Sequence, residues 1–318
     1  MHKFLLFVFA VALLGGCTKN ATKSKVVEPK DDYEIAYRSF PDELINKLKA
    51  TTTVFFHNKI NEAQNDSIEA VIKSSWTLTP IIFDDIENFA KYASDPKFSY
   101  FIIEGNTTVH SSSSNTYSNT HYYLTLRLFK DIGKKGVINT YGFCRIELYP
   151  NFRTLNIGAP GGGTGKAINN LYNKGMFYNW TPVLLKAQLS AVEQNIQSKT
   201  RPWLFQNVTD EKLVKILSRD TLYVPKSILM SFNKFTGKES NEKESVLSGY
   251  PYKYKVCTDS ELYRIFETEK RGRLLFEYVK SSTDKFISIY DLKDKKIIYK
   301  KYSPMSYNLK SKDLEKMD

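Results

Sequence analysis

A glycine-rich loop is the part of this sequence that most suggests chemistry. The stretch TLNIGAPGGGTGKAINNLYNKG, residues 154–175, leads from a strand-like segment through a Gly-Lys pair into a helix-like segment. A phosphate-binding loop has the pattern G-x-x-x-x-G-K-[ST], in which the first glycine permits the turn and the hydroxyl binds magnesium. Pro160 stands where that glycine is needed, and Ala167 stands where the hydroxyl is needed. We therefore interpret the loop as a hinge with a solvated Lys166, and we predict no nucleotide cofactor.

The histidines do not form a metal-ligand pattern. His57 follows a strand-like run, and His110 and His121 flank the polar stretch SSSSNTYSNT, which joins two strand-like runs. If those strands pair, the two imidazoles approach each other. A metal site still needs a third ligand, and no cysteine or carboxylate is placed in the sequence to supply it. We therefore predict surface histidines and no bound metal.

Motifs that carry a nucleophile or a catalytic metal, such as G-x-S-x-G, H-E-x-x-H and C-x-x-C, are absent from the sequence. The acidic pair at 31–32 falls in a polar segment, and the pair at 84–85 is placed to cap a helix. Glycosidases need two carboxylates that face each other across a cleft, which a sequence alone does not show. Trp76, Trp180 and Trp203 are candidates for a sugar site, but we interpret them as core or interface residues. The sequence therefore yields no catalytic residue.

The N-terminus carries the most specific signal. MHKFLLFVFAVALLGGCTKN has a basic start, an apolar run from Phe4 to Leu14 that is too short to span a bilayer, and the sequence Leu-Gly-Gly before Cys17. This arrangement resembles the lipobox of bacterial lipoproteins. The resemblance covers residues 1–20 and implies that residues 1–16 are a signal peptide and that Cys17 is the acylated first residue of the mature chain.

The residues after Cys17 bear on where the lipid holds the protein. Thr18 replaces the aspartate of the inner-membrane retention signal, and no early acidic run of the kind that directs lipoproteins to the cell surface follows. We therefore predict the periplasmic face of the outer membrane, with membrane lipid as a partner through Cys17. Residues 17–32 are polar and are predicted to be a lipidated, flexible tether.

The charge and the cysteines limit the choice of partners. The chain of 318 residues has 46 basic and 34 acidic residues, a net charge of +12. The lysines are scattered among acidic residues, which argues against nucleic acid and favours a lysine-rich surface with some preference for anionic headgroups or glycan. Cys144 and Cys257 lie in apolar strand-like runs, where two buried free thiols are favoured over a disulfide.

The order of predicted elements repeats along the chain. Residues 33–155 and 210–305 each read as strand, helix, strand, helix and three further strands. At an offset of 174 residues, Asp85 falls on Asp259 and Glu87 falls on Glu261. The sequence thus predicts an α+β fold made of two tandem β-α-β-α-β-β-β modules with mixed sheets. The mature chain also resembles uncharacterised two-repeat lipoproteins of gram-negative bacteria, a resemblance that implies no activity.

A helical linker is predicted between the two modules. Residues 156–209 contain the glycine hinge and two helix-like segments, and the second segment spans residues 181–197. Its apolar stripe is expected to pack against one or both modules. The stripe consists of Leu184, Leu185, Leu189, Val192 and Ile196. Residues 306–318 form a C-terminal tail.

Two hypotheses about function follow from these observations. The first is a non-catalytic binding or scaffolding lipoprotein whose partner is an envelope protein or glycan, without nucleic acid or cofactor. The second is an envelope hydrolase that acts on glycan or peptide through a site assembled from distant residues. The absence of catalytic motifs favours the first hypothesis. A deep pocket with convergent polar side chains would favour the second.

Overall fold

The computed structural model describes residues 39–57, 62–111, 116–151, 154, 170–173, 175–233, 238–241, 244–306, 308–315 and 317. The predicted signal peptide, Cys17 and the tether lie outside the described residues. The glycine hinge with Pro160, Lys166 and Ala167 also lies outside them. The predictions for these segments therefore remain predictions.

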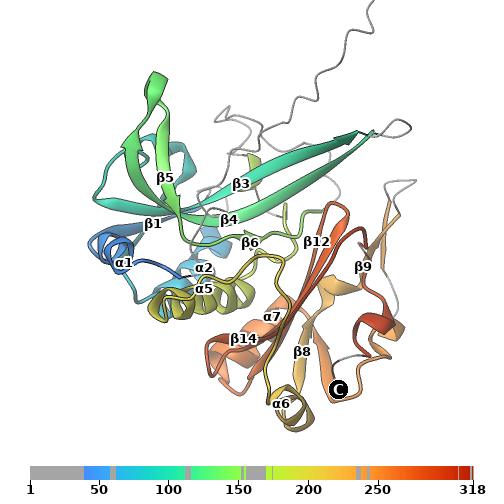
Figure 1. Cartoon of the computed structure of the whole chain (residues 1–318). Helices are drawn as coiled ribbons and strands as arrows, with labels where there is room; N and C mark the ends of the chain where they lie inside the picture. Colours follow the sequence, from blue (N-terminus) through green and yellow to red (C-terminus); the bar gives the residue numbers. More distant parts are fainter. Residues whose placement is uncertain are drawn as a thin grey trace, which may run out of the picture.

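The chain is a mixed α+β protein, as predicted, and its first sheet is built from the first half of the sequence (Figure 1). The strand order is β2-β1-β3-β4-β5, with β6 paired to β4. β1 runs parallel to β2 and to β3, whereas β4 runs antiparallel to β3 and to β5. The strands are β1 (Thr52–His57), β2 (Ile81–Asp85), β3 (Phe98–Ser111), β4 (Thr116–Ile132), β5 (Ile138–Gly142) and β6 (Ile146–Glu147).

The second sheet has the order β11-β8-β12-β13-β14-β7. β8 runs parallel to β11 and to β12, whereas β13 runs antiparallel to β12 and to β14. The strands of this sheet are β7 (Val208–Thr209), β8 (Leu222–Pro225), β11 (Tyr254–Cys257), β12 (Leu274–Ser281), β13 (Asp284–Asp291) and β14 (Lys296–Ser303). A small antiparallel pair, β9 (Met230–Phe232) and β10 (Glu239–Asn241), stands apart from it.

Five strands of the two sheets correspond in order and direction. In each sheet the first strand is paired on both sides. Thr53 of β1 pairs with Ile81 and Ser99, and Leu222 of β8 pairs with Tyr254 and Leu274. The Thr53 amide donates to the carbonyl of Pro80 at 2.8 Å, and the Leu222 amide donates to the carbonyl of Lys253 at 2.9 Å. The two sheets thus share the strand order and also a backbone hydrogen bond at the start of the first strand.

The helices predicted between the strands are present, with local differences in type, whereas the helical elements at 42–49, 213–219 and 226–229 were not predicted. Asp85 and Thr258 occupy the same place after the second strand of each sheet and cap the element that follows. The sequence alignment that placed Asp85 on Asp259 was therefore wrong by one residue. The helical elements are α1 (Asp42–Lys49), α2 (Glu62–Ser75), η3 (Ile86–Lys91), η4 (Lys134–Gly136), α5 (Pro182–Gln197), α6 (Leu213–Arg219), η5 (Lys226–Leu229), η6 (Glu244–Leu247), α7 (Asp259–Tyr263), the π-helical η7 (Arg264–Thr268) and η8 (Ser311–Asp313).

The segment WTLTPIIF shows why one predicted strand is shorter than expected. Only its last three residues join β2, because the polar groups before them bond elsewhere. The Trp76 indole donates to Thr79 Oγ1 at 2.8 Å, and the backbone amide of Thr77 donates to Glu193 of α5 at 2.9 Å. These bonds hold the segment as a turn against α5, where it is unavailable to the sheet ladder.

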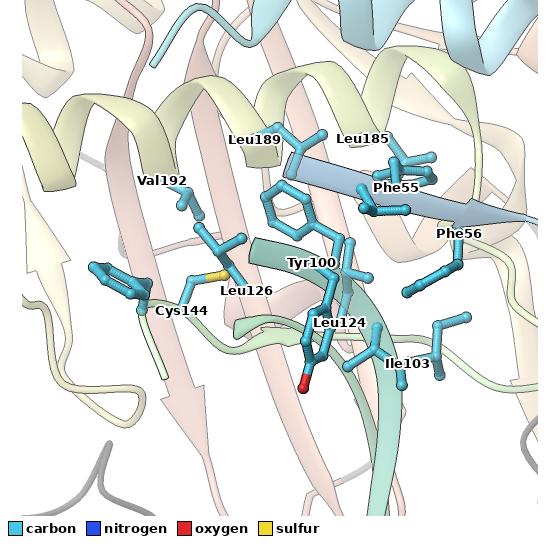
Figure 2. Close-up of a cluster of buried hydrophobic side chains, with 14 of the residues drawn as sticks. Phe55, Phe56, Tyr100, Ile103, Leu124, Leu126, Cys144, Leu185, Leu189 and Val192 are labelled. Carbon is cyan, nitrogen blue, oxygen red and sulfur yellow. The ribbon is translucent and has the colours of Figure 1, made fainter. Parts of the chain in front are cut away.

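Helix α5 lies between the two sheets and contributes to two hydrophobic cores, one against each sheet (Figure 1). Leu185, Leu189 and Val192 point from α5 toward the side chains of the first sheet (Figure 2). Leu184 faces the other way, into the core beside β11, β12 and α7. The buried residues of α5 thus lie on two packed faces, of which the first-sheet face carries most of the predicted stripe. The helix predicted at 181–197 is therefore a central element of the architecture.

The two equivalent caps give a test of the likeness between the halves. Asp85 accepts a hydrogen bond from the amide of Glu87, and Thr258 accepts one from the amide of Glu261. We expect Asp85→Ala and Thr258→Ala each to lower the free energy of unfolding by about 1 kcal/mol, because each leaves a backbone donor of the first turn without its partner. Urea unfolding measures the change, with the exposed Ser260→Ala as the control. A loss of unfolding free energy for only one of the two variants would contradict the equivalence of the Asp85 and Thr258 caps.

Candidate functional site

The structure places most of the candidate residues from the sequence in structural roles. Trp76 is buried in the core of the first sheet, and Trp180 is packed against that core. Trp203 is 46% exposed, so the prediction of a core position is wrong for it. Asp85 caps η3, and Asp84 accepts hydrogen bonds from Tyr92 and Asn88 at 2.6 and 2.7 Å. The acidic pair therefore anchors a turn, and its oxygens are occupied by neighbouring side chains.

The prediction of surface histidines is wrong for His121, which is buried in β4. Its strand faces β12 of the second sheet, so the imidazole meets Ser281 at 2.9 Å. His57 is half-buried, with its ring nitrogens 3.2 Å from Asn65 and 3.3 Å from Glu69. Among the described residues, no group of three or more side chains is arranged to hold a metal ion.

Cys144 and Cys257 are both buried free thiols, as the sequence favours. They belong to separate hydrophobic cores, one on each side of α5. Burial raises the pKa of the Cys144 thiol to about 12. A thiol with such a pKa is a poor nucleophile, and the Cys144 side chain packs in the core of the first sheet.

A pocket of about 90 Å³ lies where β6, α5 and the face of the second sheet meet. Its volume is enough for a few water molecules or for one small group of a larger ligand. Its lining combines aromatic and aliphatic side chains with charged and polar ones. The polar and charged lining residues are Arg145, Glu147, Gln188, Asn195, Glu277, Ser288, Tyr290 and Lys300, and the apolar lining includes Phe40, Phe143, Leu204, Val279 and Phe286.

Glu147, at the end of β6, is a buried carboxylate held in its charged form. Burial alone would raise its pKa, but Arg145, His121 and Ser281 outweigh burial and hold the pKa at about 2. Arg145 Nε lies 2.6 Å from one carboxylate oxygen, and the other accepts from Ser281 at 2.8 Å and lies 3.2 Å from His121 Nδ1. Three side chains from two sheets thus use most of the lone pairs of this group.

Glu277 of β12 is the second buried carboxylate, and its environment shifts its pKa in the opposite direction to that of Glu147. Burial raises its pKa, although three donors partly counteract that effect. The donors are the side-chain amides of Asn179 at 2.9 Å and Gln188 at 2.5 Å, and the Tyr290 hydroxyl at 2.6 Å. Glu277 is therefore also supplied with partners from the linker, from α5 and from β13.

Two groups in the pocket remain available. The Lys300 amine of β14 forms no hydrogen bond or ion pair with any residue that the structure describes. Burial lowers its pKa to about 8, while Glu147 and Glu277 act to raise it. The Gln188 side-chain carbonyl is buried and has no hydrogen-bond partner. A buried polar atom without a partner costs free energy, so the Gln188 carbonyl favours an occupant that satisfies it. Lys300 is half-buried and lines the same pocket, where its amine can donate to such an occupant.

His121, Glu147 and Ser281 are the residue types of a serine hydrolase triad, but their geometry is different. In a catalytic relay, the hydroxyl and the carboxylate contact opposite nitrogens of the imidazole. Here Ser281 Oγ and Glu147 Oε2 both approach the same nitrogen, His121 Nδ1, and the hydroxyl donates directly to the carboxylate. All three side chains are buried. The cluster is a structural contact between β4, β6 and β12.

The sequence does not reveal the pocket, because the residues that line it are far apart in the chain. One signal was available: Glu147 and Glu277 are single acidic residues inside apolar strand runs, RIELY and LLFEYV. A carboxylate at such a position is costly unless it is paired, and this cost marks it as a candidate for a buried network. No comparable signal identifies Lys300, which lies in the lysine-rich strand KIIYKKYS.

Comparison of the chain with protein-family models, with curated proteins and with solved structures finds no match. Within the described part of the chain, no helix has the length and apolar character needed to cross a membrane. The case for a function therefore depends on the pocket and on the N-terminal sequence.

Proposed function

We propose that this chain is a non-catalytic binding lipoprotein of the bacterial envelope and that it holds its ligand in the pocket between the two sheets. The observation that carries the proposal is that some polar groups of the pocket have hydrogen-bond partners within the chain and others do not. Glu147 and Glu277 are each occupied by three donors of the chain itself, whereas the Lys300 amine and the Gln188 carbonyl lack partners among the described residues. The available groups suit recognition, and the carboxylates are not free for proton transfer.

The same groups specify the ligand chemistry. Lys300 offers a positively charged donor, and the Gln188 carbonyl offers an acceptor. A secondary amide satisfies both, because its carbonyl accepts from Lys300 and its N–H donates to Gln188. The apolar wall around Phe143 and Phe286 suits the methyl or methylene group next to such an amide. Peptides and N-acetylated glycans of the envelope both carry this group.

The fold itself is proposed to be a tandem duplication of one module. Support comes from five corresponding strands with the same order and directions, and from equivalent caps at Asp85 and Thr258. A helix also precedes the first strand of each sheet, α1 in one case and α6 in the other. The duplication explains why a pocket forms at all, since two open sheets that share one central helix leave a junction between their faces.

The binding proposal is tested by titration calorimetry with two probes, N-acetylglucosamine and N-acetylalanine methylamide. We expect at least one probe to bind, and Lys300→Met to weaken that binding at least tenfold. Lys301→Met is the matched control, because adjacent residues of a strand point to opposite faces, and it should bind as the unaltered chain does. Binding should also weaken as the pH rises above about 8, where Lys300 loses its proton. Failure of both probes, or equal binding by Lys300→Met, would contradict the proposal.

A second candidate function is an envelope hydrolase that acts on glycan or peptide. The observation in its favour is that two carboxylates lining one pocket have pKa values shifted in opposite directions, as is common for an acid and base pair. Turnover of purified peptidoglycan by the chain, abolished by Glu277→Gln, would select this function over binding alone.

The proposed location at the periplasmic face of the outer membrane depends on Cys17. The Leu-Gly-Gly-Cys sequence leads us to expect that the chain extracted from membranes starts at Cys17 and carries acyl chains. Intact mass spectrometry measures both properties. Cys17→Ser should remain uncleaved or leave the membrane fraction. An unmodified Cys17 in the unaltered chain would end this part of the proposal, as would a Cys17→Ser variant that is cleaved and still fractionates with membranes as the unaltered chain does.

A further inference from the structure

A second surface of the molecule is suited to an interaction that the pocket does not explain. The hairpin formed by the end of β4 and by β5 projects from the first sheet at the top left of Figure 1. Its turn exposes three aliphatic side chains within seven residues: Ile132 is 63% exposed, Val137 is 58% exposed and Ile138 is 40% exposed. The other large exposed apolar residues of the described chain are scattered over several elements.

The turn is ordered by its own hydrogen bonds, so it displays these side chains in a fixed way. The Gly133 amide donates to the carbonyl of Val137 at 2.7 Å and closes the turn. Gly136 adopts a φ of 75°, a conformation that favours glycine. The Asn139 side chain donates to Asp131 at 2.5 Å, which engages the one carboxylate of the segment. The apolar exposure is therefore a property of a structured hairpin.

The charge of the hairpin indicates the kind of partner. The segment KDIGKKGVI, residues 130–138, has three lysines and one aspartate, a net charge of +2. The Lys130 and Lys134 side chains are exposed beside the aliphatic group. Aliphatic side chains surrounded by lysines match the interface of an anionic bilayer, where the apolar groups enter the acyl boundary and the amines reach the headgroups.

The described chain begins near the foot of this hairpin. Phe40, close to the first described residue, stacks on Phe143 with ring centroids 5.5 Å apart. Phe143 directly follows β5, so the segment that leads back to Cys17 joins the body at the foot of this hairpin. The five residues of β5 span about 17 Å from foot to tip. A chain tethered at the foot therefore has the tip within easy reach of the membrane that holds it.

We propose that the tip of the β4–β5 hairpin, made of Ile132, Val137 and Ile138, is a membrane-contact site that inserts into anionic phospholipid. A lipid anchor confines the protein to the membrane, and the hairpin then fixes its orientation on the surface. The bilayer as occupant rests in part on the proposed lipid anchor, but the affinity of the hairpin for lipid is a property of the chain without acylation. The two proposals therefore fail separately.

Vesicle co-sedimentation tests the site with the chain from Thr18 onward, which lacks the apolar leader and Cys17 and keeps every described residue. We expect binding to phosphatidylethanolamine–phosphatidylglycerol vesicles, weaker binding to phosphatidylcholine vesicles, and at least a tenfold loss of binding for the triple variant Ile132→Ser, Val137→Ser, Ile138→Ser. The control triple variant, Ile82→Ser, Val214→Ser, Met305→Ser, removes exposed apolar side chains elsewhere and should bind within twofold of the unaltered chain.

Circular dichroism and thermal unfolding establish that both triple variants are folded, which is expected because all six side chains are exposed. The proposal is overturned if the unaltered chain does not bind vesicles, or if the tip variant binds as well as the control variant does. A dimer of the unaltered chain that the tip variant dissolves, without vesicle binding, would identify a second copy as the occupant and would equally overturn the membrane site.

Discussion

Replacing Asn179 by alanine is expected to lower the free energy of unfolding by about 4 kcal/mol. Asn179 is buried and bonds to three places: its carbonyl accepts from the amide of Tyr149 at 2.8 Å, and its amide donates to the carbonyl of Glu147 at 3.0 Å and to Glu277 at 2.9 Å. The substitution removes the side-chain partners of the Tyr149 amide and the Glu147 carbonyl, and it leaves the buried Glu277 with only Gln188 and Tyr290 as donors. The cost therefore exceeds that of an ordinary surface change.

Urea unfolding followed by circular dichroism measures this change. The exposed Asn170→Ala is the matched control and should stay within about 0.5 kcal/mol of the unaltered chain. Because Asn179 joins β6 to β12, its loss should also separate the unfolding of the two halves, which calorimetry would detect as a second transition. A loss below about 1 kcal/mol with a single transition would mean that the junction does not depend on this residue.

Acid should destabilise the chain through Glu147, and this is the second large effect. The folded-state pKa of Glu147 is about 2, below its ordinary value of 4.5, because Arg145, His121 and Ser281 overcome the effect of burial. A depressed carboxylate pKa adds stability that is fully present above the unfolded pKa and is lost as pH falls through the folded pKa. The lost contribution amounts to about 3 kcal/mol between pH 4.5 and pH 2.

The pH dependence is measured by urea unfolding of the unaltered chain and of Glu147→Gln at several pH values. The free energy of unfolding of the unaltered chain should exceed that of the variant most above pH 4.5, and this difference should shrink toward pH 2. Glu277 is present in both proteins, so the opposite sign of its raised pKa cancels in the difference. A difference that does not vary with pH would show that Glu147 is not held in its charged form by its neighbours.

Much of the architecture follows from local sequence signals. Alternation and turn residues located the strands, and the apolar stripe near Leu189 located α5 within one residue of its observed bounds. The repeated element order predicted mixed sheets, whereas the order of the strands within each sheet was not predicted. Boundaries were less accurate where a tertiary contact decided the conformation, as for Trp76 and Thr77, whose polar groups bond to Thr79 and Glu193.

Local sequence signals could not predict the candidate site, for a physical reason. Its parts come from β6, α5, β12 and β14, and each residue acquires its character from burial and from neighbours distant in the sequence. His121 illustrates the problem, because its polar flanking sequence predicts a surface position while the second sheet covers it. Lys300 has the same sequence surroundings as Lys301, yet only Lys300 lines the pocket. The strand register and the packing of two sheets decide such differences.

The most direct test of recognition in this pocket is a crystal structure of the chain soaked with N-acetylglucosamine or with N-acetylalanine methylamide. The predicted result is density for the acetamido group inside the pocket, with its carbonyl within hydrogen-bond distance of Lys300 Nζ and its N–H facing the Gln188 carbonyl. The contradicting result is a pocket that holds only water at saturating concentrations of both probes.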